Sequence, residues 1–307
     1  MLKSYLRNTA ENRNLAVLHI TVLIWGFTGI IGALISVSAT HLVWYRVLIA
    51  FITLYLYFIF SKKSFKVSRI TLIKLFFTGA VVGAHWILFF QSIKSSTVSV
   101  ALVCLSSLTL FTAILEPILS NKKISKLEII IGFLIITGIY LIFKFESQYT
   151  FGIICGLLSA LCASLFSIIN SKQVKNRSAT VISFYELIGA WFWISLLMVL
   201  KGEFTEEMKL NFSDLAYLLI LGTICTSVAY VAGVSVMKEL TAFRVALITN
   251  LEPVYGILLA FLFLGKKEQM TIGFYAGCFI ILIAIFLYPF IKNRIQHQKL
   301  NKQIPIV

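Results

Sequence analysis

The residues best suited to chemistry lie in a long apolar stretch, Thr241–Lys267. It contains Glu252, with Asn250 and Pro253 beside it and Arg244 eight residues earlier. A carboxylate at the centre of a membrane helix costs at least ~2.5 kcal/mol, so it must face protein or water. Proline cannot donate to the carbonyl four residues before it, and such freed backbone is tolerated where it is buried in protein or lines a cavity. We therefore expect a substrate site or a proton carrier here, with Glu252 as its leading residue.

Structural roles are open for the same residues. The Glu252 carboxylate could pair with an arginine or histidine of another helix, and Arg244 lies near enough to the end of its segment to extend toward the headgroups. Asn250 points to a different part of the helix than Glu252. On one straight helix Arg244 and Glu252 share a face and lie about 12 Å apart along the axis.

Arg46 and His85 are two further polar groups inside apolar segments. Arg46 could hold a substrate carboxylate through two parallel hydrogen bonds. It could equally extend to the headgroups, next to Trp44 and Tyr45 in an aromatic belt. His85 lies in the middle of its segment, where it is either a hydrogen-bonded core residue or a proton carrier.

Two glutamates, Glu186 and Glu116, also lie inside apolar segments. Glu186 could gate the cytoplasmic side of a transport path, unless Lys172 or Lys175 is its partner. Glu116 is near the end of its segment, where an ion pair with Lys122-Lys123 would also account for it. Both remain candidates for substrate binding or gating.

Three aromatic residues, Trp25, Trp86 and Tyr230, lie inside apolar segments. They could line a binding site, although packing in the core is the default explanation for them.

The composition of the 307-residue chain is that of a polytopic membrane protein. It is 59% hydrophobic, has a mean hydropathy of +0.95 and is only 13% charged, whereas soluble proteins are about 25% charged. The positive residues lie between apolar segments, so topology explains the net charge of +15 better than nucleic-acid binding does. The five cysteines lie in apolar segments without a CxxC pair, which indicates core residues. We expect the polar N-terminus to be retained.

We predict an all-α protein with ten transmembrane helices. Their expected ranges are 15–35, 42–60, 71–92, 98–119, 127–144, 151–170, 180–200, 214–236, 242–264 and 271–290. With the N-terminus in the cytoplasm, cytoplasmic segments hold 19 lysines and arginines and outer segments hold 6. Because cytoplasmic loops carry the excess of positive charge, we expect a cell inner-membrane protein with both termini in the cytoplasm.

The two halves of the chain resemble each other. Trp86, Lys94, Thr97 and Lys122-Lys123 recur 144 residues later as Tyr230, Lys238, Thr241 and Lys266-Lys267. Arg46 and Glu186 correspond at an offset of 140. The two LEP sequences, Leu115–Pro117 and Leu251–Pro253, are 136 residues apart and therefore out of register. Halves of five spans each have opposite orientations, an inverted repeat of the kind that many secondary transporters use around a midplane site.

We place the first repeat at residues 1–146, the second at 147–292 and a cytoplasmic tail at 293–307. Glycines four residues apart predict close helix contacts. The pairs are Gly79 and Gly83, Gly152 and Gly156, and Gly273 and Gly277. They could serve contacts within the chain or in a homodimer.

The chain resembles the EamA family of the drug/metabolite transporter superfamily over residues 12–290. The resemblance rests on the two five-span halves, Trp25-Gly26 in the first span, and the run PVYGILLAFLFLGKK that ends span nine. The family usually has Gly-Glu where this chain has Asn121-Lys122 and Gly265-Lys266, and proline where it has Thr109, so roles of those glutamates do not carry over. The resemblance implies secondary transport, and family members include exporters of amino acids and related metabolites.

We therefore expect a secondary transporter, not an enzyme, that exports a small polar metabolite such as an amino acid by alternating access. Glu252 would face the amine, and Arg46 or Arg244 the carboxylate. Proton coupling through Glu252 or His85 and uncoupled facilitation fit the sequence equally. The lipid bilayer is the other partner, and we expect no cofactor, no metal and no ATP, since a GxxxxGK[ST] loop is missing.

Three alternatives remain at this point. An exchanger of phosphorylated or nucleotide-linked sugars would need several cations at the midplane. A membrane-embedded lipid-modifying enzyme would need paired carboxylates or clustered histidines at one interface. A structural subunit of a larger complex would not need charges at the midplane.

Overall fold

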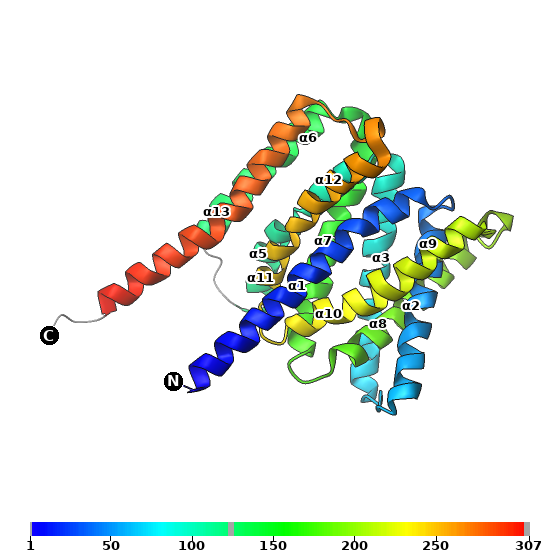
Figure 1. Ribbon diagram of the computed structural model, residues 1–307, viewed down its shortest axis with the longest axis horizontal. Helices are drawn as coiled ribbons and strands as arrows, with labels where there is room; N and C mark the ends of the chain where they lie inside the picture. Colours follow the sequence, from blue (N-terminus) through cyan, green and yellow to red (C-terminus); the bar gives the residue numbers. More distant parts are fainter. Residues whose placement is uncertain (1, 122–125, 304–307) are drawn as a thin grey trace.

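All regular secondary structure in the computed structural model, which describes residues 2–121 and 126–303, is helical (Figure 1). The first half contains α1 (Leu2–Leu34), α2 (Ala39–Ser61), α3 (Arg69–Ser95), α4 (Val98–Leu105), α5 (Leu108–Leu119) and α6 (Lys126–Phe145). The second half contains α7 (Thr150–Gln173), α8 (Ala179–Lys201), α9 (Phe212–Gly222), the π-helical turn η3 (Thr223–Val228), α10 (Ala229–Val236), α11 (Ala242–Thr249), α12 (Leu251–Leu264) and α13 (Ile272–Gln303). The connections hold three short 3-10 turns, η1 (Ser147–Tyr149), η2 (Glu206–Met208) and η4 (Gly265–Glu268).

The helices confirm the all-α class. Eight of the predicted spans are long and apolar enough to cross a membrane, and the other two, 127–144 and 271–290, correspond to the shorter apolar parts of α6 and α13. Helix α13 continues into the predicted tail as far as Gln303, and residues 304–307 lie outside the described part of the chain. The start of α1 and the end of α13 lie on the same side of the bundle, as an even number of spans requires (Figure 1). We call this the terminus side, and the opposite one the far side.

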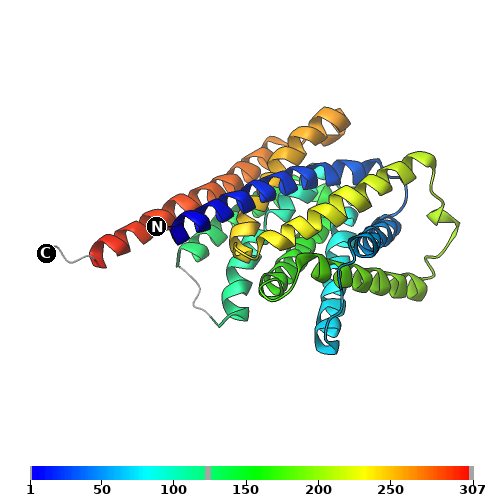
Figure 2. The same ribbon diagram turned by 60° about the horizontal axis from the view of Figure 1, so that its bottom comes forward.

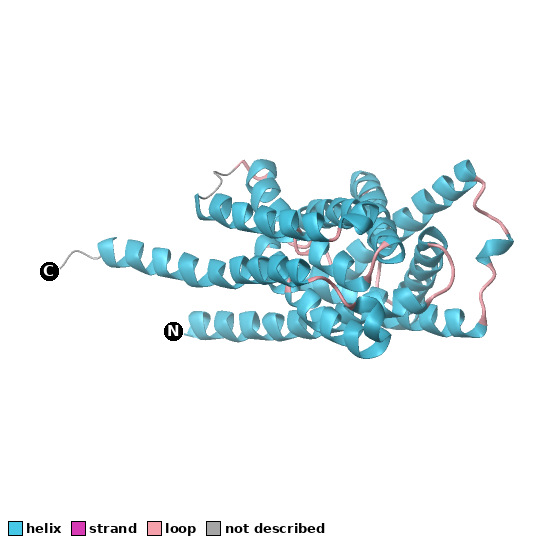
Figure 3. Cartoon of the chain, turned by 90° about the horizontal axis from the view of Figure 1, so that it is seen from above, coloured by secondary structure: helices cyan, strands magenta, loops and turns pink. Residues whose placement is uncertain are grey.

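Equivalent helices of the two halves pack in equivalent ways. Helix α1 lies along α10 and α12, and its counterpart α7 lies along α3, α4 and α5. Figures 1 and 2 both show α1 and α10 side by side. Helices α2 and α8 pack on each other, while α6 and α13 pair along one edge of the bundle (Figure 1). This correspondence is the packing that two repeats of opposite orientation produce. Figure 3 shows from above that both chain ends lie on the same side.

The helix caps confirm the predicted register between the halves. The Thr97 hydroxyl accepts a hydrogen bond from the Val100 backbone N–H and begins α4. The Thr241 hydroxyl, 144 residues later, accepts one from the Arg244 N–H and begins α11. The lysine pair predicted to share this register, Lys122-Lys123, lies outside the described residues.

Span nine is broken where the sequence places a proline. Helix α11 ends at Thr249 and α12 begins at Leu251. Pro253 has no N–H for the Thr249 carbonyl, and its ring would clash with that carbonyl in a regular helix. The predicted interruption next to Glu252 is therefore confirmed.

Span four is broken at the equivalent place without a proline. Helix α4 ends just before Ser106, which stands 144 residues before Asn250. The Ser107 hydroxyl donates to the Cys104 carbonyl at 2.6 Å, and such local bonds compete with the helical pattern. The Asn250 amide donates to the hydroxyl of Thr109, so the two broken spans are joined next to their interruptions.

The three glycine pairs all lie at helix contacts within the chain. Gly79 and Gly83 face α8, where an added Cβ would meet Glu186, Ala190 or Ile194. Gly152 and Gly156 face α3 and α4, and Gly273 and Gly277 face α6. The predicted close packing is confirmed. All five cysteines are free thiols, and four of them are buried, as core residues should be.

We expect Gly79→Ala to destabilise the protein and Gly83→Ala to be close to neutral. A Cβ at Gly79 would lie 2.3 Å from the Glu186 carbonyl oxygen and 2.6 Å from the Ala190 nitrogen, both backbone atoms. Overpacking of this kind costs about 1–3 kcal/mol. A Cβ at Gly83 would lie 3.2 Å from the end of the Ile194 side chain, which can move, and helix propensity returns about 1 kcal/mol. Thermal unfolding in detergent measures both; equal melting temperatures for the two variants would contradict the assignment.

Candidate functional site

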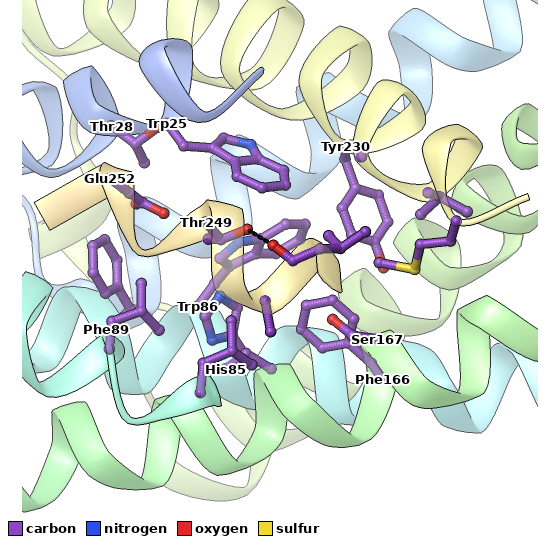
Figure 4. A pocket seen from close by; sticks show the side chains of 18 of the residues that line it. Trp25, Thr28, His85, Trp86, Phe89, Phe166, Ser167, Tyr230, Thr249 and Glu252 are labelled. Carbon is purple, nitrogen blue, oxygen red and sulfur yellow. Dashed lines mark hydrogen bonds between the residues drawn. The ribbon is translucent and has the colours of Figure 1, made fainter. Parts of the chain in front are cut away.

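A cavity lies between the two halves, near the broken spans. Its empty volume, including the part open to solvent, is about 780 Å³. Six of the predicted site residues line it: Trp25, Arg46, His85, Trp86, Tyr230 and Glu252. Figure 4 shows Trp25, Trp86, Tyr230 and Glu252 around the same space. Most of the wall is aromatic or aliphatic with a few polar groups, which is the usual character of a site for a small molecule.

A row of four contacting side chains crosses from one half to the other. The Arg46 guanidinium lies over the Trp86 ring, 4.5 Å from its centroid. The Trp86 and Tyr230 rings meet edge to face, with centroids 5.5 Å apart. The Tyr230 hydroxyl donates to Glu186 Oε2 at 2.7 Å. The predicted correspondences of Arg46 with Glu186 and of Trp86 with Tyr230 therefore appear as two matched pairs that meet at the centre.

Arg46 points into the protein and not toward the headgroups. Its residue is 2% exposed, its Nε donates to the Thr226 hydroxyl at 2.6 Å, and its Nη1 has no hydrogen-bond partner among the described residues. The neighbouring aromatic residues bind the second half of the chain: Trp44 Nε1 donates to the Ser195 hydroxyl and the Tyr45 hydroxyl to the Met208 carbonyl. The interpretation of Arg46 as a headgroup contact is wrong in this conformation.

The partner of Arg46 was missed by the sequence analysis. Thr226 lies in η3, where the chain forms one π-helical turn, and its hydroxyl donates to the Leu221 carbonyl five residues back, at 2.6 Å. One hydroxyl thus accepts from Arg46 and donates within the turn. Single π turns often occur at functional sites, but the apolar pattern of this segment does not predict one.

Glu252 is 5% exposed and lines the cavity at the start of α12. Within the described residues no group donates a hydrogen bond to its carboxylate, and the ion pairs found there, Lys201–Glu203 and Lys209–Glu206, lie at the surface. Its predicted structural pairing with an arginine or histidine is therefore not seen. Arg46 and Glu252 are a basic and an acidic group in one cavity wall, and among the described residues they form no ion pair with each other.

His85 is held by another helix. Its Nδ1 lies 3.0 Å from the Ser159 carbonyl oxygen, and the Ser159 hydroxyl donates to the His85 carbonyl at 2.9 Å. The ring also packs edge to face on Phe166. These contacts fix the imidazole in the cavity wall, so a structural role accounts for it.

Glu186 lies directly behind the cavity wall. The Asn170 amide donates to its Oε2 at 3.1 Å, next to the bond from Tyr230. The lysines expected as alternative partners bind backbone carbonyls elsewhere: Lys172 that of Leu119 and Lys175 that of Lys238. The explanation of Glu186 by a lysine partner is therefore wrong.

Asn250 and Arg244 do not line the cavity. The Asn250 amide binds Thr109 and the Ala246 carbonyl at the helix break. Arg244 is exposed near the start of α11. Because α11 ends at Thr249, Arg244 and Glu252 do not share the face of one straight helix, and that expectation is wrong.

Glu116 caps a helix of the other half. Its carboxylate accepts from the Phe243 N–H at 2.9 Å, at the start of α11. At the equivalent start of α4, Glu268 of the second half accepts from the N–H groups of Val98 at 3.1 Å and Ser99 at 2.9 Å. Carboxylates are stabilised at helix N-termini by the free N–H groups and the helix dipole. Glu116 thus joins the halves on the terminus side, and Lys122-Lys123, its suggested ion-pair partners, lie outside the described residues.

Comparison with known proteins gives the family. Residues 14–144 and 150–289, one segment in each half, match the EamA-like transporter family. The chain belongs to the EamA-like transporter family. This EamA-family protein is therefore a multi-pass membrane transporter and not an enzyme, as the resemblance implied.

Two relatives carry the name uncharacterized transporter. The one from Archaeoglobus fulgidus is 23% identical over 200 residues, 65% of this chain and 69% of the relative. The one from Clostridium kluyveri is 25% identical over 190 residues, 58% of this chain and 59% of the relative. A solved crystal structure with 12% identity matches with a TM-score of 0.67, covering 90% of this chain and 98% of the other, which supports the fold of the EamA-family protein.

Proposed function

We propose that this protein is a secondary transporter of the cell inner membrane that exports a small zwitterionic metabolite, such as an amino acid, by alternating access. The observation that carries the proposal is that Arg46 and Glu252, one basic and one acidic side chain, line the same cavity without forming an ion pair. An α-amino acid presents a carboxylate and an ammonium group, which would complete the hydrogen bonds of both residues. The cytoplasmic placement of the termini and the outward direction are parts of this proposal, supported by the charge distribution and by the family resemblance.

The energetics favour a ligand with both charges. Burying an ionic group is costly unless a partner binds it directly, so a ligand that supplies a carboxylate to Arg46 and an ammonium group to Glu252 would offset part of that cost. The Arg46 Nη1 has a free donor, and the Glu252 carboxylate has free acceptors, among the residues described. The aromatic wall would enclose the rest of the molecule.

The exchange of phosphorylated or nucleotide-linked sugars is less well supported. Of the lysines and arginines in residues 2–121 and 126–303, Arg46 alone lines the cavity. A phosphate with two negative charges would meet one guanidinium and also face the Glu252 carboxylate, which repels it.

The test is a thermal-stability screen of the purified protein with free amino acids and two analogue series, N-acetylated and carboxamide forms. A ligand at 100 times its Kd stabilises by about 2.7 kcal/mol, which shifts the melting temperature visibly. We expect stabilisation by at least one free amino acid and by neither analogue series.

Glu252→Gln should remove the preference for a free amine, with an affinity loss of about 30-fold, since a lost hydrogen bond to a charged group costs about 1.5–3 kcal/mol. The matched control is Glu206→Gln, at an exposed ion pair with Lys209. Unchanged binding and transport in Glu252→Gln would overturn the assignment, and a response to phosphorylated compounds alone would favour the exchanger.

A further inference from the structure

A second buried carboxyl, Glu186, is not used by the proposed substrate site. The residue is 0% exposed and lies within the apolar helix α8. Its Oε2 accepts from Tyr230 and Asn170, while its Oε1 is sealed from solvent and has no hydrogen-bond partner. The Asn170 Oδ1 is likewise buried without a donor in the part of the chain that is described.

The group formed by Asn170, Glu186 and Tyr230 has more acceptor oxygens than donors. Its donors are the Tyr230 hydroxyl and the Asn170 amide, and both already serve Glu186 Oε2, the amide also lying 3.2 Å from the Tyr230 oxygen. Two oxygens remain with nothing to accept. An unpaired buried acceptor costs about 1–3 kcal/mol, and an ionised carboxylate without a counter-charge costs more. A protonated carboxyl carries no charge and supplies the missing O–H donor.

No cation takes the place of that proton. Residues of helices α2, α3, α7 and α10 surround Glu186. Of the titratable side chains on these helices, Tyr230 contacts the Glu186 carboxyl. The other charged or titratable side chains of these helices are His41, Tyr45, Arg46, Tyr55 and Tyr57 on α2, Arg69, Lys74, His85 and Lys94 on α3, and Cys155, Cys162 and Lys172 on α7. In the described part of the chain none of them forms a hydrogen bond or an ion pair with Glu186.

We propose that Glu186 is the proton-binding site of this transporter, and that Tyr230 links its occupancy to the substrate cavity. This inference rests on the proposed transport function. Tyr230 has its hydroxyl on Glu186 and its ring in the cavity wall, against Trp86, on which Arg46 lies. A substrate carboxylate that moves the Arg46 guanidinium would disturb its contact with Trp86, and Trp86 contacts Tyr230. A proton on Glu186 would change the hydrogen bond of Tyr230 at the other end of the same row of side chains.

The step is a reversible proton transfer between water and the carboxyl. The Glu186 carboxylate takes a proton from water on one side of the membrane, forming an O–H bond at a carboxyl oxygen. After the halves rock, that bond breaks and the proton passes to water on the other side, leaving the carboxylate. The conformation described here holds Glu186 sealed, so the exchange with water belongs to the states on either side of it.

Infrared difference spectroscopy on the reconstituted protein tests the site without any substrate. Spectra are compared between neutral and alkaline pH for the wild type, Glu186→Gln, Glu252→Gln and Tyr230→Phe. We expect a carbonyl band of a protonated carboxylic acid that is lost in Glu186→Gln, kept in Glu252→Gln and shifted in Tyr230→Phe, which removes one hydrogen bond to it. A wild-type spectrum without such a band, or a band that survives in Glu186→Gln, overturns the proposal.

Folding can be separated from protonation. Glutamine has the shape of the protonated carboxyl and carries N–H donors of its own, so Glu186→Gln should keep the wild-type melting temperature. If this variant does not fold, the shift of the band in Tyr230→Phe decides the question, because Glu186 is then intact. A band that does not move in Tyr230→Phe would contradict the assignment.

Flux in proteoliposomes tests the coupling. With a free amino acid that stabilises the protein, a gradient of one pH unit should change the steady-state accumulation ratio by up to about tenfold per proton in the wild type, and leave it near one in Glu186→Gln. A pH-dependent ratio in Glu186→Gln overturns the coupling. If the Glu186 band is present but no amino acid stabilises the protein, the proton site is supported and the proposed substrate class is wrong. If amino acids are transported but the band is missing, the substrate class is supported and the proton site is wrong.

Discussion

Arg46→Met should weaken substrate binding strongly and, in the absence of substrate, should leave the protein as stable as the wild type or more so. The guanidinium is buried, with one hydrogen bond to Thr226 and a cation–π contact to Trp86. The cation–π contact contributes about 2 kcal/mol in a desolvated site. Removing the buried charge returns a desolvation cost of several kcal/mol. Thr226 keeps its bond to the Leu221 carbonyl, so the variant leaves no unsatisfied donor at the π turn.

The expected loss of affinity is large because the methionine cannot bind a carboxylate. Truncating one member of a buried charge pair costs about 2–5 kcal/mol, which corresponds to a loss of at least about 30-fold. Melting temperatures are measured with and without the zwitterionic ligand, and Lys201→Met, at an exposed ion pair with Glu203, is the control. A melting temperature that falls in Arg46→Met while the ligand response persists would assign Arg46 a structural role.

The parts of the site that the sequence predicted are those set by local rules. A proline four residues after Thr249 must interrupt the helix there, and Thr97 and Thr241 are good cap residues at the predicted offset. Charges inside apolar spans must face protein or water, which is why Glu252 was expected at a site, whereas for Arg46 a headgroup contact was an equal alternative. Each of these inferences needs only the neighbouring residues and the bilayer.

The parts that the sequence did not predict depend on packing between distant helices. The π turn brings Thr226 to Arg46 directly after the close contact of Gly222 with Ile49, where an added Cβ would lie 2.7 Å from the Ile49 side chain. The break at Ser106 has no proline. Glu116 lies in α5, and its partner is a backbone N–H 127 residues away. Spacing along one chain segment carries no information on such pairings.

Asp214→Asn should shift the protein toward a conformation that is open on the far side. Asp214, at the start of α9, is 1% exposed and reaches across to the first half. Its Oδ1 accepts from the Ser36 N–H at 2.9 Å and its Oδ2 from the Ser36 hydroxyl at 2.5 Å. If the halves rock around the cavity, these contacts must break when the far side opens.

Two more carboxylates join the halves on the same side. Glu146 of the first half accepts from the Thr271 N–H at 2.8 Å, and Glu268 holds the start of α4. Asp214 is the simplest of the three to test because both of its cross-half hydrogen bonds go to one residue, Ser36. Asparagine keeps the shape of the side chain and removes the charge that strengthens both bonds.

The expected change follows from the strength of hydrogen bonds to charged groups. A loss of about 1.5–3 kcal/mol raises the population of the far-side-open state by about 10- to 100-fold. Spin labels are placed at Leu34 and Phe212, exposed positions near Ser36 and Asp214. The distance between the two labels, measured by pulsed electron–electron double resonance, reports the separation of the two halves. We expect longer distances in Asp214→Asn and wild-type distances in Glu206→Gln, where the carboxylate is exposed and belongs to the same side. Equal distances in the wild type, Asp214→Asn and Glu206→Gln would show that Asp214 stabilises the connection between α1 and α2 at Ser36 without holding the halves together.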